Sequence, residues 1–270
     1  MIGDHNQLST ITLQNELKSK VSDADLNNIE LMDCRESYFE RMFRICKKNN
    51  WTHAYDILTY QGRMHSDIAD FPNRYFYNNK LLPANEWQTQ PLAPLLHDAN
   101  NIYQHITVNE RIAFISYEPD LLISLNDKIN ETEANITVNI IKSIHKLTNS
   151  IIFHLTKKTI GVITPYRNQI ALIKHKLRIS EVKELENIMV DSVERFQGSQ
   201  RDIIILSFCM NKKYQLDFFC NLNRERNVDR KLNVALTRAR KHLFIVGNKN
   251  VVQENAIYNE FIKSIPVFYV

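Results

Sequence analysis

The feature that most constrains this chain is an alternation of short apolar runs with amphipathic segments through its second half. The runs at residues 111–117, 159–166 and 202–208 are rich in β-branched residues, as buried parallel strands are. The segment after residue 130 has Ala134, Val138, Ile141 and Ile144 at near-helical spacing. Strands that alternate with helices predict a parallel α/β sheet with helices on both faces.

Further elements continue this order. Helices are expected within residues 167–177 and 230–240, and strands within residues 186–198 and 243–248. Asn130 and Glu133 have the spacing of a capping box at the start of the helix that follows residue 130. The two amphipathic segments and their flanking strands are therefore the framework on which a site would be built.

The first half of the chain differs from the second. Residues 36–49 predict a helix with Phe39, Phe43 and Cys46 among its apolar positions, and residues 71–94 are a polar connection that contains prolines. We place a domain boundary near residues 50–58. The chain is therefore expected to divide into residues 1–52 and residues 53–270.

Composition excludes several classes of protein. Hydrophobic residues are 44 % and charged residues 24 %, as in ordinary globular proteins. There is no apolar run of the ~20 residues that a membrane span requires, and the first ten residues lack the features of a signal peptide. Four cysteines without a CxxC pair favour reduced thiols in a cytoplasmic protein, with a zinc site as the alternative.

The charge of the chain permits a nucleic-acid partner without requiring one. The net charge is +4, which is too small to argue for such a partner by itself. Lysines and arginines are concentrated between Arg195 and Lys241, where a solvated basic face is the simplest interpretation.

Polar loops adjoin several of the predicted strands. Because sheets of this class bind ligands at the carboxyl ends of their strands, we expect these loops to gather there. Together they offer hydroxyls, amides, one glycine and two arginines: Thr164, Ser192, Gln169, Gln197, Gln200, Gly198, Arg238 and Arg240. The planar guanidinium of arginine matches phosphate oxygens and is always charged. These residue types favour a ligand that carries phosphate.

Five stretches of the chain resemble the motifs of a known family, in that family's order. They are "GDHNQL" (Gly3–Leu8), Gln61–Leu81, "GVITPYRNQ" (Gly161–Gln169), Ser192–Ser207 and Arg230–Asn248. They are similar to motifs III, IIIa, IV, V and VI of superfamily 1 helicases, in the Upf-like branch of RNA helicases of nonsense-mediated decay and related DNA helicases. The resemblance implies a RecA-like second motor domain at residues 53–270. Residues 1–52 would then be the carboxyl-terminal remnant of a first RecA-like domain with a linker helix.

The resemblance implies three residues that act on ATP. Arg238 matches the arginine finger, which would reach the γ-phosphate of ATP bound on the first domain. Arg63 matches a second γ-phosphate contact in motif IIIa. Gln7 matches the glutamine of motif III, which senses the γ-phosphate and couples the two domains.

Other matched positions concern the nucleotide and the single strand. Gln200 stands where the family usually has a glutamate that contacts the ribose, and Gly198 and Arg240 are assigned to the nucleotide with it. A surface salt bridge is the open alternative for Arg240. Ser192, Thr164 and Tyr166 would line the channel for single-stranded DNA or RNA, whereas His65 and Phe71 are interpreted as packing residues.

The chain also departs from the family pattern. Gly62 replaces a tyrosine near the adenine, Gln200 replaces the glutamate at the ribose, and Glu194 replaces an aspartate. We expect these changes to weaken nucleotide binding. No glycine is followed by lysine and no Asp-Glu pair occurs, so neither the phosphate-binding loop nor the magnesium-binding carboxylate of this superfamily is present. ATP and Mg²⁺ would be bound mainly by the missing first domain.

Two functions from different classes follow. In the first, the chain is the carboxyl-terminal motor domain of an ATP-dependent helicase and is inactive as an ATPase by itself. In the second, it is a freestanding nucleic-acid or partner-binding module derived from a helicase. The sequence does not decide between DNA and RNA, between unwinding and translocation, or between oligomeric states.

Overall fold

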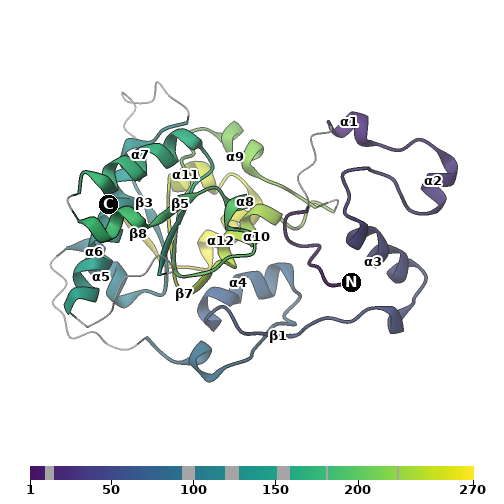
Figure 1. Cartoon of the computed structure of the whole chain (residues 1–270), viewed down its shortest axis with the longest axis horizontal. Helices are drawn as coiled ribbons and strands as arrows, with labels where there is room; N and C mark the ends of the chain where they lie inside the picture. Colours follow the sequence, from purple (N-terminus) through teal and green to yellow (C-terminus); the bar gives the residue numbers. More distant parts are fainter. Residues whose placement is uncertain (10–14, 93–100, 119–127, 151–158, 181, 224) are drawn as a thin grey trace. The chain divides into compact units, whose positions relative to one another are not determined.

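The computed structural model describes residues 1–9, 15–92, 101–118, 128–150, 159–180, 182–223 and 225–270. The chain divides into two compact units, Met1–Thr59 and Tyr60–Val270 (Figure 1). The division follows directly on the stretch, residues 50–58, in which the sequence places a boundary.

The first unit is built from short helices, and none of its described apolar residues is buried. It contains α1 (Glu16–Ser19), α2 (Ala24–Asn28), α3 (Tyr38–Lys48) and the 3₁₀ turn η1 (Thr52–Ala54). Helix α3 begins where Ser37 Oγ accepts the N–H of Glu40 at 3.1 Å. Glu30 forms ion pairs with Arg44 and Lys48. The buried residues of this unit, among those described, are polar: Asn6, Ser19 and Glu30.

The second unit contains a six-stranded, fully parallel sheet with the order β5-β4-β6-β7-β3-β8. The strands are β3 (Ile112–Ser116), β4 (Ile160–Ile163), β5 (Met189–Asp191), β6 (Arg201–Ser207), β7 (Ala239–Gly247) and β8 (Val267–Tyr269). A separate parallel pair joins β1 (Tyr60–Gln61) and β2 (Leu82–Pro83). The parallel α/β prediction is confirmed.

Helices connect these strands. They are α4 (Ser66–Phe76), η2 (Glu86–Thr89), α5 (Ile102–Asn109), α6 (Glu131–Ser150), α7 (Arg167–Arg178), η3 (Lys183–Asn187), α8 (Val193–Phe196), α9 (Lys213–Phe219), α10 (Arg230–Leu236), α11 (Lys249–Val252) and α12 (Ala256–Lys263). The helices expected from the sequence at α6, α7 and α10 are all present.

Both faces of the large sheet are covered (Figure 1). On one face Val162 and Ile205 share a buried cluster with Ile141 of α6 and Ile173 of α7. On the other face α4 and α12 meet, and the rings of Phe71 and Phe261 lie 5.0 Å apart. Alternate residues of each strand therefore enter two separate cores, as the period of two requires.

Two expected elements differ from the observed ones. Within residues 186–198 only Met189–Asp191 is a strand, because the chain turns at Ser192 into helix α8. The polar connection expected at residues 71–94 begins inside helix α4, and its last two residues lie outside the described part of the chain. Pro72 is tolerated in α4, although it removes a helix hydrogen bond, because burial of Ile68 and Phe76 holds the helix in place.

The capping box predicted at α6 is half right. Asn130 Oδ1 accepts the N–H of Glu133 at 2.8 Å, as expected. The Glu133 carboxylate does not return to Asn130 but accepts hydrogen bonds from Tyr117 Oη (3.0 Å), Ser207 Oγ (2.7 Å) and the N–H of Cys209 (2.7 Å). The Glu133 carboxylate therefore accepts hydrogen bonds from buried donors after β3 and at the end of β6, and not from the backbone N–H of Asn130.

Candidate functional site

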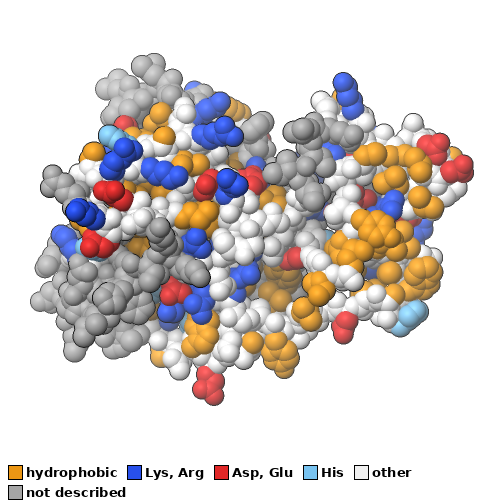
Figure 2. All heavy atoms as spheres, in the orientation of Figure 1, with side chains coloured by type: hydrophobic (Ala, Val, Ile, Leu, Met, Phe, Trp, Pro, Cys, Tyr) orange, Lys and Arg blue, Asp and Glu red, His pale blue; other side chains and the backbone are white. Residues whose placement is uncertain are grey.

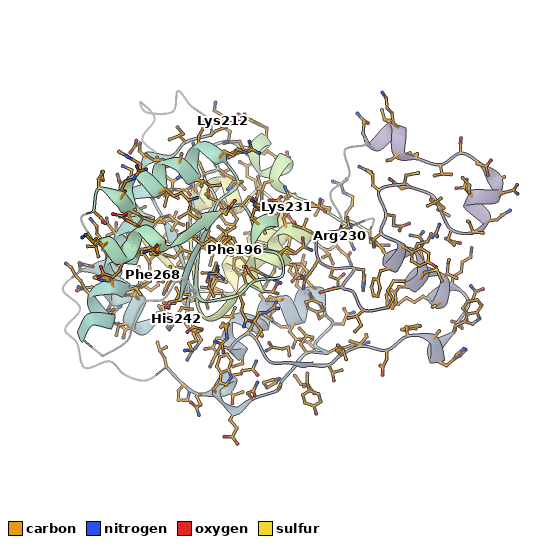
Figure 3. The ribbon with its side chains drawn as sticks, in the orientation of Figure 1. Phe196, Lys212, Arg230, Lys231, His242 and Phe268 are labelled. Atoms are coloured by element: carbon orange, nitrogen blue, oxygen red, sulfur yellow. The ribbon has the colours of Figure 1, made fainter. Side chains whose placement is uncertain are left out.

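The parallel sheet places the predicted site residues at two opposite edges. Thr164 and Ser192 follow β4 and β5 at the carboxyl ends, and the N–H of Thr164 donates to the carbonyl of Asp191 at 3.1 Å. Gln200 and Arg238 directly precede β6 and β7, so they lie at the amino ends. Lys212 follows β6 and His242 lies in the first half of β7, and Figure 3 shows these two residues at opposite sides of the second unit.

The expectation that all motif loops gather at the carboxyl edge is therefore wrong. Two parallel strands of one sheet require a connection that crosses back along the length of the strands, and β5 and β6 are two such strands, on either side of β4. Helix α8 makes that crossing between the end of β5 and the start of β6. The residues after the crossing, Gly198 to Gln200, are thus carried to the amino edge.

At the amino edge five residues form what we call the arginine cluster: Arg63, Ser199, Gln200, Thr237 and Arg238. Arg63 Nε donates to Gln200 Oε1 at 3.2 Å, and Arg63 Nη1 donates to the carbonyl of Thr237 at 3.2 Å. Arg238 Nη1 donates to the carbonyl of Ser199 at 3.3 Å. Three segments far apart in the sequence thus bring two guanidinium groups to one place.

Arg238 is buried, with 2 % of its surface exposed. It follows α10, and its Nε donates to the carbonyl of Val234 at 3.0 Å while Nη2 donates to Thr237 Oγ1 at 3.0 Å. These acceptors are neutral, and hydrogen bonds from arginine to an anionic phosphate are stronger than those to neutral groups. A phosphate that reached Arg238 would therefore be a stronger acceptor for its N–H groups than these neutral partners are.

Two glutamines fix the turn that carries Arg63. Gln61 Oε1 accepts the N–H groups of Arg63 (3.0 Å) and Met64 (2.8 Å). The amide of the buried Gln88 donates to the carbonyls of Gln61 (3.0 Å) and Met64 (2.6 Å). Burial lowers the pKa of Arg63, but a guanidinium stays protonated at neutral pH. The sequence did not single out Gln88, because a glutamine in a polar connection carries no local signal.

Gly198 and Arg240 flank the arginine cluster. Gly198 has a φ of +80°, a conformation that glycine adopts without the steric cost other residues meet. Arg240 Nη1 bonds Asp202 Oδ1 at 2.8 Å, and its guanidinium lies 5.2 Å from the Trp87 ring centre. Arg240 thus forms the salt bridge that was the alternative to phosphate contact, and its contact with a nucleotide stays a prediction.

At the carboxyl edge, Ser192 and Glu194 connect to helix α10. Although burial by itself raises the pKa of Glu194, a hydrogen bond from Ser192 and the nearby Lys231 ammonium lower it overall. Lys231 Nζ lies 3.4 Å from Glu194 Oε1, and Lys231 and Phe196 occupy the same region of the second unit (Figure 3). Ser192, which is predicted to bind the strand, is therefore linked through Glu194 to helix α10, and Arg238 follows this helix in the chain.

Of the other two residues predicted for the strand, Thr164 is less accessible than Ser192, whereas Tyr166 is half-buried as Ser192 is. Thr164 is fully buried, and its Oγ1 has no hydrogen-bond partner within the described part of the chain. Tyr166 is half-buried at the start of α7, and its Oη accepts a hydrogen bond from Gln215 Nε2 at 3.5 Å. Contact of the Thr164 hydroxyl with a strand would require a local opening, so this role stays a prediction.

Helix α10 is anchored at its amino end by Asp229. The buried carboxylate accepts the N–H groups of Lys231 (2.9 Å) and Leu232 (3.2 Å) and the Tyr258 hydroxyl (2.9 Å). Such an N-cap satisfies backbone donors that the helix leaves unpaired. Asp229 was missed in the sequence, although an aspartate directly before a predicted helix is a recognisable cap signal.

The remaining candidate, Gln7, belongs to the first unit. Its amide donates to Asp4 Oδ2 at 2.9 Å. Across the described residues, no group of three or more His, Cys, Asp or Glu side chains is placed to hold a metal ion. Nor does any described helix have the length and apolar character needed to cross a membrane.

Comparison with known proteins places the chain in a family. The family model described as "AAA domain" matches residues 34–250. An uncharacterised ATP-dependent helicase of Methanocaldococcus jannaschii is 30 % identical over 97 % of this chain and 34 % of its own length. The DNA polymerase alpha-associated DNA helicase A of Saccharomyces cerevisiae is 29 % identical over 98 % of this chain and 37 % of its own length. The regulator of nonsense transcripts 1 of Dictyostelium discoideum is 31 % identical over 97 % of this chain and 17 % of its own length.

The parallel α/β fold and the matched relatives define the class as a helicase-family domain. Within that class, the chain belongs to the Upf-like branch of superfamily 1 helicases and corresponds to their carboxyl-terminal RecA-like domain. It spans between 17 % and 37 % of the length of the three relatives named above.

Proposed function

We propose that this chain is the second motor domain of an ATP-dependent helicase that moves along single-stranded nucleic acid. Arg63 and Arg238 would contact the γ-phosphate of ATP held on a first motor domain. An arginine finger stabilises the charge that develops on the transferred phosphoryl group and accelerates hydrolysis by ~10³ or more. The observation that carries this proposal is the convergence of Arg63 and Arg238 on Thr237 and the Ser199–Gln200 turn.

Several observations support different roles for the two edges of the sheet, with ATP contact at the amino edge and strand contact at the carboxyl edge. The amino edge holds the arginine cluster, and the carboxyl edge holds Ser192 and Tyr166, which we propose to contact the strand. Helix α10 joins them, since Lys231 pairs with Glu194 at one side and Thr237 ends the helix beside Arg63 at the other. Such an element would let strand binding influence the position of Arg238.

The composition of the first unit supports its assignment to another domain. It has no buried apolar residue among those described, whereas Leu17, Trp51 and Leu58 are exposed, and Figure 2 shows hydrophobic side chains gathered over this unit. A segment of this size without an apolar core is not expected to fold by itself. We therefore assign residues 1–52 to the end of the first RecA-like domain. The four free cysteines fit the cytoplasmic location that we propose.

ATP turnover by this chain alone tests the proposal. The printed sequence has no GxxxxGK[ST] loop, and the proposal therefore predicts no turnover above background, with or without a single strand. Hydrolysis by the isolated chain that Arg238→Ala abolishes would overturn it.

The reading frame that encodes the chain supplies a second test. The proposal predicts an in-frame GxxxxGK[ST] followed by an Asp-Glu pair upstream of Met1. A stop codon directly upstream, with strand binding intact, would instead favour a freestanding binding module.

A further inference from the structure

We infer that Lys212, Lys213 and Tyr214, which we call the α9 turn, bind single-stranded nucleic acid beyond the residues of the recognised motifs. The lysines would contact backbone phosphates, and the tyrosine ring would stack on a base. The inference rests on the proposed function, because it extends the strand path past Ser192 and Tyr166. None of the five motif stretches includes these three residues.

The position of the α9 turn in the sheet is the first argument. It follows β6 at the carboxyl edge, and β6 pairs with β4, which leads directly to Tyr166. Neighbouring strands lie about 4.8 Å apart, so the two loops emerge side by side. Gln215, within the same helix as the turn, donates to Tyr166 Oη at 3.5 Å.

The backbone at the start of the α9 turn is held by the side-chain amide of the buried Gln215. Gln215 has 1 % of its surface exposed, and its Oε1 accepts the N–H groups of Asn211 (2.8 Å) and Lys212 (3.0 Å). Asn211 Oδ1 in turn accepts from Asn130 Nδ2 at 2.6 Å. A held backbone reduces the ordering cost of binding, so the side chains above it are presented in a prearranged position.

The chemistry of the exposed side chains is the third argument. Lys212 and Lys213 are exposed, Tyr214 is 54 % exposed, and Arg167 is exposed at the start of the neighbouring helix α7. Figure 3 shows Lys212 at the periphery of the second unit. Lys213 pairs with Glu254 at 3.2 Å, but exposed pairs of this kind are weak. Cations beside an aromatic face are what single-strand binding surfaces use.

Fluorescence anisotropy with a labelled oligothymidylate and a matched oligouridylate tests the inference on the whole chain. Tyr214→Ala should weaken binding about tenfold at every salt concentration, since stacking does not depend on counterions. Lys212→Ala should reduce the slope of log K against log salt by about 0.7, the value for one phosphate contact on a single strand. The two variants therefore lose affinity in distinguishable ways.

Matched controls come from exposed residues away from this edge. Tyr60→Ala removes a 69 % exposed tyrosine on β1, and Lys263→Ala removes a 62 % exposed lysine on α12. Both should bind like the original chain. All four side chains are at the surface, so thermal unfolding should be unchanged and should exclude misfolding as the cause of any loss.

Three results are distinguishable. Losses at Tyr214 and Lys212 with intact controls support the inference. Strand binding that neither variant changes would overturn the inference and leave the proposed function standing. A chain that binds neither oligonucleotide at low salt would overturn both the inference and the strand-binding part of the proposed function.

Discussion

Glu133 lies fully buried at the junction of α6, β3 and β6, and replacing it with glutamine removes its charge while keeping its shape. Burial raises the pKa of this carboxyl group from 4.5 to about 7, although hydrogen bonds from Cys209, Ser207 and Tyr117 oppose the rise. The folded protein therefore holds the proton more tightly than the unfolded chain. The resulting stabilisation is fully present below about pH 4.5 and is lost as the pH rises through about 7.

The size of this effect follows from the shift. At 1.36 kcal/mol for each pKa unit, the change from 4.5 to about 7 corresponds to roughly 3 kcal/mol. The free energy of unfolding of the original chain, minus that of Glu133→Gln, should therefore fall by roughly 3 kcal/mol between about pH 4.5 and about pH 8. The glutamine variant titrates no proton at this position, so it supplies the reference.

Urea unfolding of both proteins across this pH range measures the difference. Glu260→Gln is the matched control, because Glu260 is 53 % exposed on α12 and pairs only with the exposed Lys263 among the ion pairs described. Its difference from the original chain is measured over the same pH range as a baseline. A difference for Glu133→Gln that follows this baseline, or that grows with pH, would refute the assignment of a raised pKa to this residue.

Two further substitutions test the packing around the site. In Gly161→Ala the new methyl would lie 2.7 Å from Phe196 Cε1 and 2.9 Å from Arg201 Cγ, so thermal unfolding should show a loss of about 1–3 kcal/mol; an unchanged midpoint would contradict this crowding. Asp229→Ala removes the cap of α10 and leaves the buried Tyr258 hydroxyl without its acceptor, so the loss should be roughly 3 kcal/mol. A loss below about 1 kcal/mol would show that Asp229 does not anchor the helix.

Local patterns were sufficient to predict the framework of the second unit. The apolar spacing of α6 and α7 and the β-branched runs of β4 and β6 identify these elements, because each pattern depends on residues near one another in the sequence. The joint position of Arg63 and Arg238 was implied by motif order rather than by any local pattern. Motif order does not show how Arg63 reaches the segment that contains Arg238. In the structure Arg63 does so through hydrogen bonds to Thr237 and Gln200.

Other features depend on tertiary contacts that the sequence does not display. The edge of the sheet at which Gln200 lies is set by the four-residue helix α8, which is too short to leave a periodic signal. A proline such as Pro72 predicts the end of a helix, yet Pro72 lies inside α4, where buried neighbours pack around it. Glu133 has the spacing of a capping residue. Its carboxylate instead accepts hydrogen bonds from Tyr117 and Ser207, which are distant from it in the sequence. In each case a remote partner outweighs the local preference.

We propose that Arg238 completes an ATP site whose other half lies on a first motor domain. The most direct test of this proposal is strand-stimulated ATP hydrolysis by the polypeptide of the full reading frame, with Arg238→Lys against the original protein. Lysine keeps the charge but lacks the planar fork, and unchanged strand affinity would report an intact fold. If Arg238 is the arginine finger, we expect kcat to fall about 10³-fold with little change in the KM for ATP. A kcat within about twofold of the original protein would contradict it.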